Sequence, residues 1–415
     1  MHASFFKANR EKLLARLPEG SVAVLFAGDY IRKTADENFL FYGSRNFVYL
    51  TGIDQPKSIL LLRKTGAGVD ETLFLSPPNP QWERWNGTLV GFDAAAGISG
   101  CRSVRPLGDF DAALDVCFTR GGATQLWLDF DKLTRNEPDS DAFKLARYAR
   151  GRFPHVVLQS VLPLMKNLRA IKADCEIEAI RRAEVLTGKG IAAMMKIAKP
   201  GLREYNLKAA FEGALMDEGA LPAFPTIISS GRNNFCIHYY GIDGLIAEGD
   251  MILNDVGARY DFIGTDVSRG WPVSGKFSDK QRILYECAYK TSEYLYSVIK
   301  PGLPHSFVDK TIKEYNANLL KEAGVISGVD EVNKLMWHGG AHHVGFDTHD
   351  VVDVTELDRP LEPGMIFCVD IGIYHEDWGI GFRLEDNCLI TAAGCENLSA
   401  AIPRSIEDIE AAMGR

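Results

Sequence analysis

The 415-residue sequence lacks a long hydrophobic run. No stretch approaches the ~20 apolar residues of a membrane-spanning helix, so we expect no membrane partner. The N-terminal segment MHASFFKANREKLLARL has no apolar stretch long enough for a signal peptide. These two absences predict a cytoplasmic protein.

Basic clusters and paired cysteines are missing as well. The formal net charge is −9, and Lys and Arg form no cluster of the kind that a nucleic-acid partner favours. The eight cysteines are scattered without a Cys-x-x-Cys pair, and most stand inside apolar runs. We therefore expect no nucleic-acid ligand, no disulfide framework and no thiolate metal site, and we interpret the cysteines as reduced packing residues.

Length and composition predict two globular domains. Hydrophobic residues make up 46% of the chain and charged residues 24%, as in an ordinary globular protein, and the chain is too long for one compact core. Strand-like and helix-like segments alternate over residues 1–163, which predicts an α/β domain. Long amphipathic helices begin at Leu164, so we place a second domain at 164–415.

The second half of the sequence contains an internal repeat. Lys199-Pro200-Gly201-Leu202 introduces a predicted helix ending near Gly219, and Lys300-Pro301-Gly302-Leu303 introduces another ending near Gly324. Each unit then leads to an Asp-x-Gly hairpin. Duplicated units of this kind predict a pseudo-twofold domain, with its site at the seam where the two hairpins converge.

The first hairpin, residues 252–268, brings two acids together. A two-residue turn at Tyr260 and Asp261 would place Asp255 directly across from Asp266, with Cβ atoms roughly 5 Å apart. Two buried carboxylates at that distance are stable only with a cation between them or a shared proton. The alternative is a solvated hairpin with two incidental acids.

The second hairpin, residues 367–391, repeats the pattern. A turn centred on Asp377 and Trp378 would place Asp370 opposite Glu385. Four carboxylates on two similar hairpins favour a metal site over chance.

Histidines gather between the two hairpins. The segment HGGAHHVGFDTHD, residues 338–350, holds four of the nine histidines, and His238 follows a Gly/Ser/Asn loop. Histidines beside paired acids favour a metal or proton-transfer role over packing. The predicted set is hard and rich in oxygen, which suits Mn²⁺ first and Co²⁺, Zn²⁺ or Fe²⁺ as alternatives. Two such ions would activate a bridging hydroxide for hydrolysis of an amide bond.

Several motifs, taken together and in order, resemble one known family, the pita-bread metallopeptidases, which includes methionine aminopeptidase, aminopeptidase P and prolidase. NDVGARYDFIGTDVSRGWPVSGKFS, HGGAHHVGFDTHD, EPGMIF and GIGFRLEDNCLIT are similar to its proline-peptidase branch. SRNFVYLTGIDQP and the loop from Glu83 to Gly87 resemble the amino-terminal domain of aminopeptidase P. The resemblance implies an α/β amino-terminal domain followed by an α+β pita-bread catalytic domain with an internal pseudo-twofold.

The resemblance also implies roles for individual residues. The implied metal ligands are Asp255, Asp266, His342, Asp370 and Glu385. The implied catalytic residues are His349, His238 and Asp370, and the implied substrate contacts are His238, His338, Arg383 and Trp85. His338 would stand in the second sphere, and Arg383 would either neutralise acids or meet a substrate carboxylate. Trp85 would either pack locally, the interpretation we prefer from the residues alone, or reach the site of a neighbouring subunit in a homo-oligomer.

The chain departs from the family pattern at two positions. Asp370-Ile371-Gly372 stands where the family has Glu-Pro-Gly, and Gly270 stands where the family continues Arg-Thr. An Asp carboxylate ends on the order of 1.5 Å short of the Glu position, a displacement that can cost roughly 100-fold in a catalytic geometry.

Three functions remain open at this point. The first is a two-metal exopeptidase that releases an N-terminal residue linked to proline, from dipeptides as in prolidase or from longer peptides as in aminopeptidase P. The second is a metal-independent hydrolase similar to creatinase. The third is a peptide-binding protein that kept the fold and lost activity through Asp370.

Overall fold

The computed structural model describes residues 1–132, 134–350 and 359–414. The chain divides into two compact units, Met1–Leu168 and Arg169–Arg415. The boundary predicted near residue 163 lies inside helix α7 (Leu162–Ala170) and stays a prediction. None of the helices in the described parts of the chain is long and apolar enough to cross a membrane.

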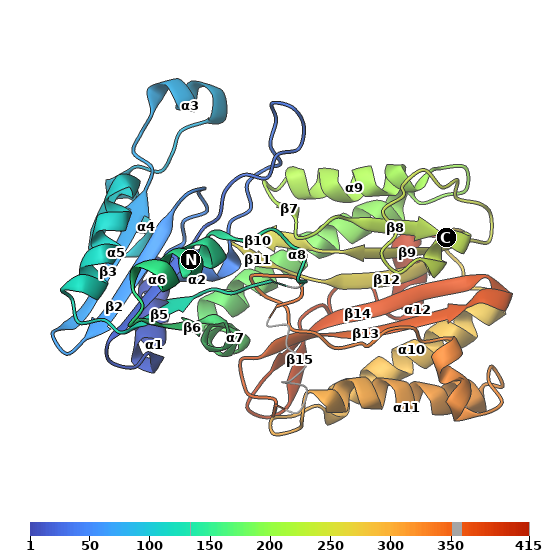
Figure 1. The fold of residues 1–415 in the computed structure, drawn as a ribbon. Coiled ribbons are helices and arrows are strands. Elements are labelled where there is room, and N and C mark those ends of the chain that lie inside the picture. The colour runs from blue at the N-terminus through green and yellow to red at the C-terminus, as the bar shows by residue number, and fades with distance from the viewer. Residues whose placement is uncertain (133, 351–358, 415) are drawn as a thin grey trace. The chain divides into compact units, whose positions relative to one another are not determined.

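The first unit is built on a six-stranded mixed sheet with the strand order β4-β3-β2-β1-β5-β6 (Figure 1). Its strands are β1 (Ser21–Phe26), β2 (Ile59–Thr65), β3 (Gly68–Leu75), β4 (Ser103–Pro106), β5 (Gln125–Leu128) and β6 (Val157–Ser160). The order of these elements confirms the predicted α/β class.

The first unit also contains helices, most of which contact its sheet. They are α1 (Ala3–Arg16), α2 (Arg45–Thr51), α3 (Pro80–Asn86), α4 (Phe92–Ser99), η1 (Leu107–Asp109), α5 (Phe110–Thr119) and α6 (Asp141–Arg152). Buried Val22 and Leu61 of the sheet form one core cluster with Leu114 of α5 and Ala146 of α6. Trp85 on α3 is 86% exposed, so the interpretation of Trp85 as a locally packed residue is wrong.

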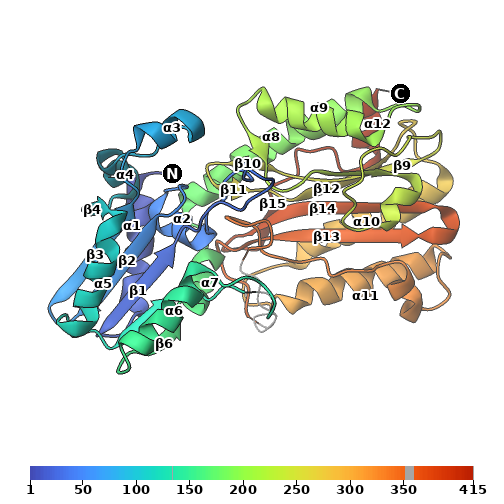
Figure 2. The same cartoon turned by 45° about the horizontal axis from the view of Figure 1, so that its top comes forward.

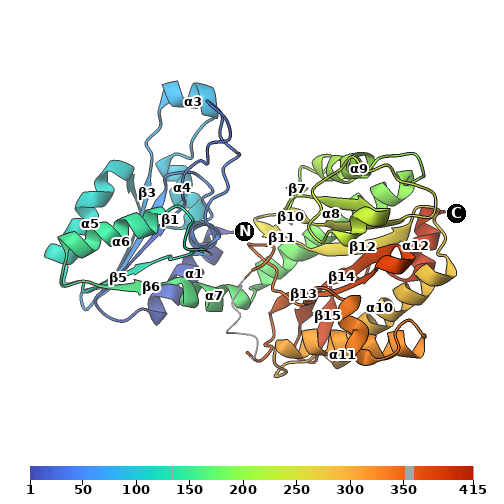
Figure 3. The ribbon, with the colours of Figure 1, turned by 45° about the vertical axis from the view of Figure 1, so that its right-hand side comes forward.

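The second unit consists of strands between two helix pairs (Figure 3). Its helices are α8 (Asp174–Ile197), α9 (Glu204–Met216), η2 (Gly231–Phe235), α10 (Asp279–Val298), α11 (Ser306–Glu322), η3 (Val329–Lys334), η5 (Glu376–Trp378) and α12 (Ile406–Met413). α8 pairs with α9 on one side of the strands, and α10 pairs with α11 on the other (Figure 2).

Two antiparallel sheets of three strands form the centre of this unit, and a third, small sheet adjoins them. The first central sheet contains β8 (Ile227–Ser230), β9 (Met251–Val256) and β12 (Val267–Pro272). The second contains β13 (Ile366–His375), β14 (Ile380–Ile390) and β15 (Cys395–Asn397). The small sheet contains β7 (Leu221–Pro222), β10 (Ala258–Tyr260) and β11 (Ile263–Gly264). Strands β12 and β14 lie side by side, which brings the two hairpins together.

Backbone hydrogen bonds repeat between the two halves of the second unit. Gly201 N donates to Ile246 O and Ile246 N donates to Leu202 O. In the other half, Gly302 N donates to Leu361 O, and Leu361 N donates to Leu303 O. The same connection in both halves confirms the predicted pseudo-twofold.

The first hairpin has a different register from the predicted one. Its turn lies at Asp261 (φ 48°) and Phe262 (φ 74°), one residue later than predicted, and Asp255 faces Ser268 across the strands. A two-residue turn of this type needs positive φ at both central positions, and Asp adopts positive φ more readily than Tyr does. Because side chains alternate along a strand, Asp266 shares a face with Ser268 and so stays a diagonal neighbour of Asp255.

The second hairpin has the predicted register. Asp370 pairs with Glu385 across β13 and β14, and the chain turns through η5 and Gly379. Gly270 on β12, the other departure from the family pattern, has a packing reason. A Cβ atom at this position would lie 2.5 Å from the Cβ of Phe382 on β14, so glycine allows the two hairpins to approach.

Candidate metal centre

The histidine-rich loop runs along β13 as an extended segment. Cys368 N donates a hydrogen bond of 2.8 Å to His342 O, and Asp370 N donates one of 2.7 Å to Gly340 O. A Cβ atom on Gly340 would lie 2.1 Å from Asp370 O, so only glycine permits this approach. The two bonds place His342 beside the acids of the second hairpin.

Four side chains converge at the seam between the hairpins. One donor atom from each of Asp266, His342, Cys368 and Glu385 lies within 4.8 Å of the other three. His342 Nε2 is 3.5 Å from Asp266 Oδ2 and 3.6 Å from Glu385 Oε1. Ser268 Oγ donates a hydrogen bond of 2.8 Å to Glu385 Oε2. The arrangement joins both hairpins and the histidine loop at one point.

Arg383 forms an ion pair with Asp255, the other acid of the first hairpin. Its Nη2 lies 2.7 Å from Asp255 Oδ2, and its Nη1 donates to Ile237 O and to the Tyr374 hydroxyl at 3.1 and 3.2 Å. Arg383 is 2% exposed, and its contact with Tyr374 is buried while those with Asp255 and Ile237 are partly buried. The guanidinium therefore neutralises part of the acidic cluster from the protein side.

The acids of the cluster resist ionisation. Burial raises the pKa of Asp266 well above its usual value, and the negative charges of Glu385 and Asp255 raise it further. Burial and Glu385 also raise the pKa of Asp370. Glu385 differs: burial opposes its ionisation, but its hydrogen bond with His342 outweighs burial and lowers its pKa to about 2. One negative charge is thus stabilised here by the protein itself, and further charges need a cation.

Three carboxylate oxygens of the cluster lack partners within the described residues. Asp255 Oδ1, Asp266 Oδ1 and Asp370 Oδ1 are buried without a hydrogen bond. A buried carboxylate oxygen left unpaired is costly, and hard divalent cations bind oxygen donors of this kind. The donor set therefore fits a divalent metal.

Comparisons with known proteins decide the family. Residues 178–392 match the model of metallopeptidase family M24, and residues 6–126 match the aminopeptidase P N-terminal domain. The chain belongs to metallopeptidase family M24. Together with the two-domain architecture, these matches place it in the pita-bread, proline-peptidase branch of enzymes.

Relatives of this M24 chain match along its whole length. The Xaa-Pro aminopeptidase of Escherichia coli (strain K12) is 28% identical over 98% of this chain and 97% of its own length. A solved structure of a putative aminopeptidase P from Bacillus anthracis is 37% identical and superposes with a TM-score of 0.97, covering 100% of this chain and 99% of that one. A structure of the E. coli aminopeptidase P with the inhibitor Pro-Leu is 27% identical, with a TM-score of 0.90 over 100% and 98% of the two chains.

The M24 chain places its other histidines around the cluster. The rings of His349 and His342 lie 4.1 Å apart between centroids. Burial and the neighbouring His342 lower the pKa of His349 to about 4. His338 Nδ1 is 3.3 Å from Asp370 Oδ2, and its Nε2 is 3.0 Å from the Tyr374 hydroxyl. His238 is exposed and lies in the loop after η2.

The convergent donor group contains one residue that the sequence did not lead us to propose as a ligand. Cys368 was expected to be a packing residue, and a thiolate metal site was excluded, yet its Sγ belongs to the convergent donor group. The available signal was its position two residues before Asp370, because alternate residues of a strand share a face. Trp85 lies on α3 of the first unit, and its predicted contact with a substrate stays a prediction.

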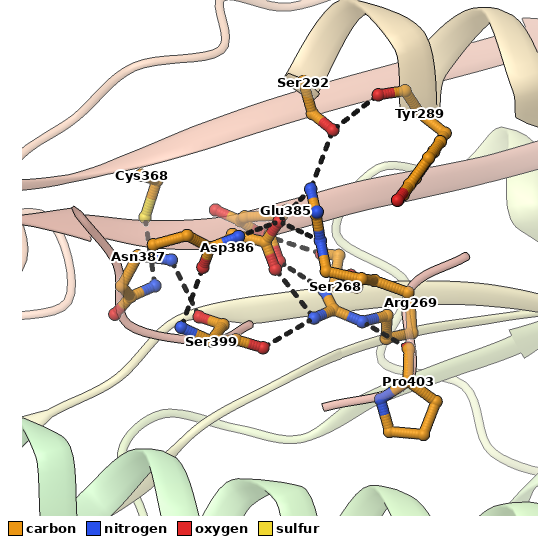
Figure 4. A network of polar contacts seen from close by, with 12 residues as sticks. Ser268, Arg269, Tyr289, Ser292, Cys368, Glu385, Asp386, Asn387, Ser399 and Pro403 are labelled. Carbon is orange, nitrogen blue, oxygen red and sulfur yellow. Dashed lines mark hydrogen bonds and ion pairs between the residues drawn. The ribbon is translucent and has the colours of Figure 1, made fainter. Parts of the chain in front are cut away.

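A buried ionic network lies on the other face of β14 (Figure 4). Arg269 Nη2 is 2.7 Å from Asp386 Oδ1, and Arg404 Nη2 is 3.0 Å from Asp386 Oδ2. Arg269 Nη1 also donates to Glu385 O at 2.7 Å. Because Arg269 belongs to β12 and Asp386 to β14, this network fixes the two hairpins against each other and so positions the predicted metal ligands.

Proposed function

We propose that the chain is a metal-dependent exopeptidase that hydrolyses the bond between an N-terminal residue and a following proline. The observation that carries the proposal is the cluster of buried acids with unpaired oxygens around His342, in a chain similar to Xaa-Pro aminopeptidases over nearly its whole length. Proline forms a tertiary amide without an N–H, so a dedicated site for this bond is chemically reasonable.

In this proposal two divalent ions are held by the residues Asp255, Asp266, His342, Asp370 and Glu385. When bound, the ions, Mn²⁺ in our proposal, supply Lewis-acid chemistry that lowers the pKa of water and polarises the scissile carbonyl. The unpaired oxygens favour this arrangement over the metal-independent alternative similar to creatinase, in which buried acids would need protein partners.

The protein's own residues handle the protons. Asp370 accepts a proton from the attacking water, for which its unpaired Oδ1 is suited. His338 orients Asp370 through the 3.3 Å contact to Oδ2. His349 stays neutral near pH 7 because its pKa is lowered to about 4, so it can donate one N–H to the oxyanion that develops on the substrate. His238, exposed on its loop, contacts the substrate.

The contacts of Arg383 indicate which length of substrate the site favours. A dipeptide presents its terminal carboxylate close to the cleaved bond, and Arg383 was one predicted partner for that group. Its Nε, Nη1 and Nη2 atoms contact Ser268, Tyr374 and Asp255 within the protein. We therefore propose that Arg383 neutralises the acids of the cluster and does not bind a substrate carboxylate. The substrates are then peptides longer than a dipeptide.

Trp85 supports a proposal about assembly. Trp85 is 86% exposed on a short helix, and tryptophan is enriched at protein–protein interfaces relative to the rest of a protein surface. We propose a homo-oligomer in which Trp85 reaches the substrate site of a neighbouring subunit. Light scattering of the natural protein and of Trp85→Ala tests it, and a natural protein that is monomeric at assay concentration contradicts it.

The proposed activity is tested with matched peptides. Protein loaded with Mn²⁺ should release the first residue from a peptide with proline in second position, and should leave the same peptide with alanine there uncut. The dipeptide made of the first two residues should be a poorer substrate than the full peptide. Failure to cleave any peptide of the proline series, with full metal occupancy shown by elemental analysis, contradicts the proposal.

A further inference from the structure

The sulfur of Cys368 lies among the proposed metal ligands. Cys368 is fully buried in β13, and its Sγ is within 4.8 Å of donor atoms of Asp266, His342 and Glu385. Asp370, the acid with the shortened side chain, does not belong to this group of four. The fourth donor of this group is thus a thiol and not the expected carboxylate.

The backbone fixes the direction of this thiol. Cys368 and Asp370 are two residues apart on one strand, so both side chains face the seam. The hydrogen bond from Cys368 N to His342 O aligns the strand with the histidine loop. Figure 4 shows Cys368 beside Asn387 of β14, whose Nδ2 lies 3.9 Å from the sulfur. This amide is a weak partner at that distance and leaves the sulfur available to an ion.

An independent observation points to a ligand at the same place. Asp266 is 4% exposed, and its Oδ1 has no hydrogen-bond partner within the described residues. Donors bound tetrahedrally to one Zn²⁺-like ion at about 2.0 to 2.3 Å lie roughly 3.3 to 3.8 Å from one another. The donor atoms of the observed group lie within 4.8 Å of one another, so side-chain shifts of about 1 Å bring them to a single ion.

We infer that Cys368 is a metal ligand that takes the place of the longer carboxylate side chain missing at Asp370. The ion beside His342 then has one sulfur, one nitrogen and two carboxylate ligands. The inference rests on the proposed function. As the bond to the ion forms, the thiol gives its proton to water. Thiolate favours borderline and soft ions, so the sulfur ligand raises the affinity of this position for Zn²⁺, Co²⁺ and Cd²⁺ more than its affinity for Mn²⁺, while the position beside Asp255 keeps oxygen ligands only.

Cobalt spectroscopy tests the sulfur ligand directly. Metal-free protein is titrated with Co²⁺, and bound metal is measured by equilibrium dialysis. The natural protein should develop a near-ultraviolet absorption from charge transfer between sulfur and cobalt, and Cys368→Ser should bind Co²⁺ without it. Cys388→Ser is the matched control, because Cys388 is also buried in this hairpin but lies outside the donor group, and it should keep the absorption.

Two results overturn the inference. One is full Co²⁺ binding by the natural protein without the charge-transfer absorption, and the other is an unchanged absorption in Cys368→Ser. Circular dichroism shows whether each variant is folded. A failed activity test with normal cobalt spectra would contradict the proposed peptidase and leave the sulfur ligand standing, so the two failures are distinguishable.

Metal preference gives a second readout. Competition between Cd²⁺ and Mn²⁺ for metal-free protein should show that Cys368→Ser lowers the ratio of Cd²⁺ to Mn²⁺ affinity by about 10-fold or more, because serine replaces a soft donor with a hard one. Cys388→Ser should leave the ratio unchanged. An equal ratio in Cys368→Ser and the natural protein would contradict sulfur ligation.

Discussion

Two consecutive residues of β14, Glu385 and Asp386, belong to two buried clusters of opposite character. Glu385 faces the seam, where three carboxylate oxygens of its neighbours have no hydrogen-bond partner within the described residues. Asp386 faces the other side, where Arg269, Arg404 and the Tyr296 hydroxyl surround it. Both clusters are buried; the protein neutralises the second fully, but the first only in part, through Arg383.

The difference separates function from stability. Burial raises the pKa of Asp386, but Arg269 and Arg404 outweigh burial and lower it, so this acid is ionised in the folded protein. Its charges are balanced, and the cluster holds β12 against β14. The cluster at the seam is left short of positive charge, which is a cost to the fold and is offset only when a cation binds.

Substitution of a seam acid should have the largest effect on activity. Asp266→Asn removes a proposed ligand from the centre of the donor group, and Lewis-acid activation is worth several kcal/mol. We expect kcat/KM to fall on the order of 10³-fold. Chelated protein should be no less stable, because asparagine replaces a buried carboxyl group whose ionisation is unfavourable beside Glu385 and Asp255. Peptide cleavage and thermal unfolding with and without chelator measure both effects.

The opposite result would remove the distinction between the clusters. If Asp266→Asn lowers the stability of chelated protein by as much as it lowers the stability of metal-loaded protein, the seam acids act in the fold and not in metal binding. Ser274→Ala, at an exposed turn outside the site, serves as a control for handling and should change neither quantity.

Removal of Asp386 should chiefly reduce stability. Asp386→Ala leaves the buried guanidinium of Arg269 without its carboxylate and leaves Arg404 paired only with the half-exposed Glu293, and breaking a buried pair in this way typically costs about 3 to 5 kcal/mol. The control is Glu396→Ala, which breaks the exposed pair with Arg181 and should cost less than about 1 kcal/mol. Urea unfolding of metal-free protein provides the comparison. Equal losses in the two variants would contradict the structural role of Asp386.

The fold was largely predictable because local pattern decides it. Alternating strands and helices indicated the first domain, and the repeated Lys-Pro-Gly-Leu segments indicated the pseudo-twofold. The register of the first hairpin was wrong because its turn contains Phe262 at positive φ. The ring of Phe262 stacks on Phe346 at 6.2 Å, and such a contact between distant segments leaves no signal in the local sequence.

The site was predictable only where residue type indicated chemistry. Acids and histidines in family motifs could be proposed as ligands. Cys368 could not, because a thiol in an apolar strand has the pattern of a core residue and its approach to His342 depends on the loop. The pair of Arg269 with Asp386 was also missed, since the two residues are 117 positions apart in the chain.

Lengthening Asp370 tests how well the seam cluster is adapted to its ions. Asp370→Glu extends the carboxylate by one methylene towards the position that the family uses. If the shorter side chain limits turnover, kcat/KM should rise, by up to about 100-fold. If Cys368 already completes the site, the added length crowds it, and the gain should appear only in the double variant with Cys368→Ser. Inactivity of the natural protein and of both variants towards all peptides with proline in second position would favour a peptide-binding role.

The buried residue Glu184 predicts how the stability of the folded protein depends on pH. This residue of α8 is buried beside the Asp386 network, and both of its carboxylate oxygens lack hydrogen-bond partners within the described residues. Burial raises its pKa from 4.5 to about 8. The folded state therefore holds a proton that the unfolded state loses above its lower pKa, so stability falls as pH rises from about 4.5 to about 8. Glu184→Gln cannot ionise and should be more stable than the natural protein at pH 8, by up to about 5 kcal/mol, and close to it near pH 4.5. Urea unfolding of metal-free protein at the two pH values checks this.

A difference between the two proteins that does not change with pH would contradict the prediction. It would show that Glu184 is already ionised in the fold, and that the network around Asp386 neutralises a second acid.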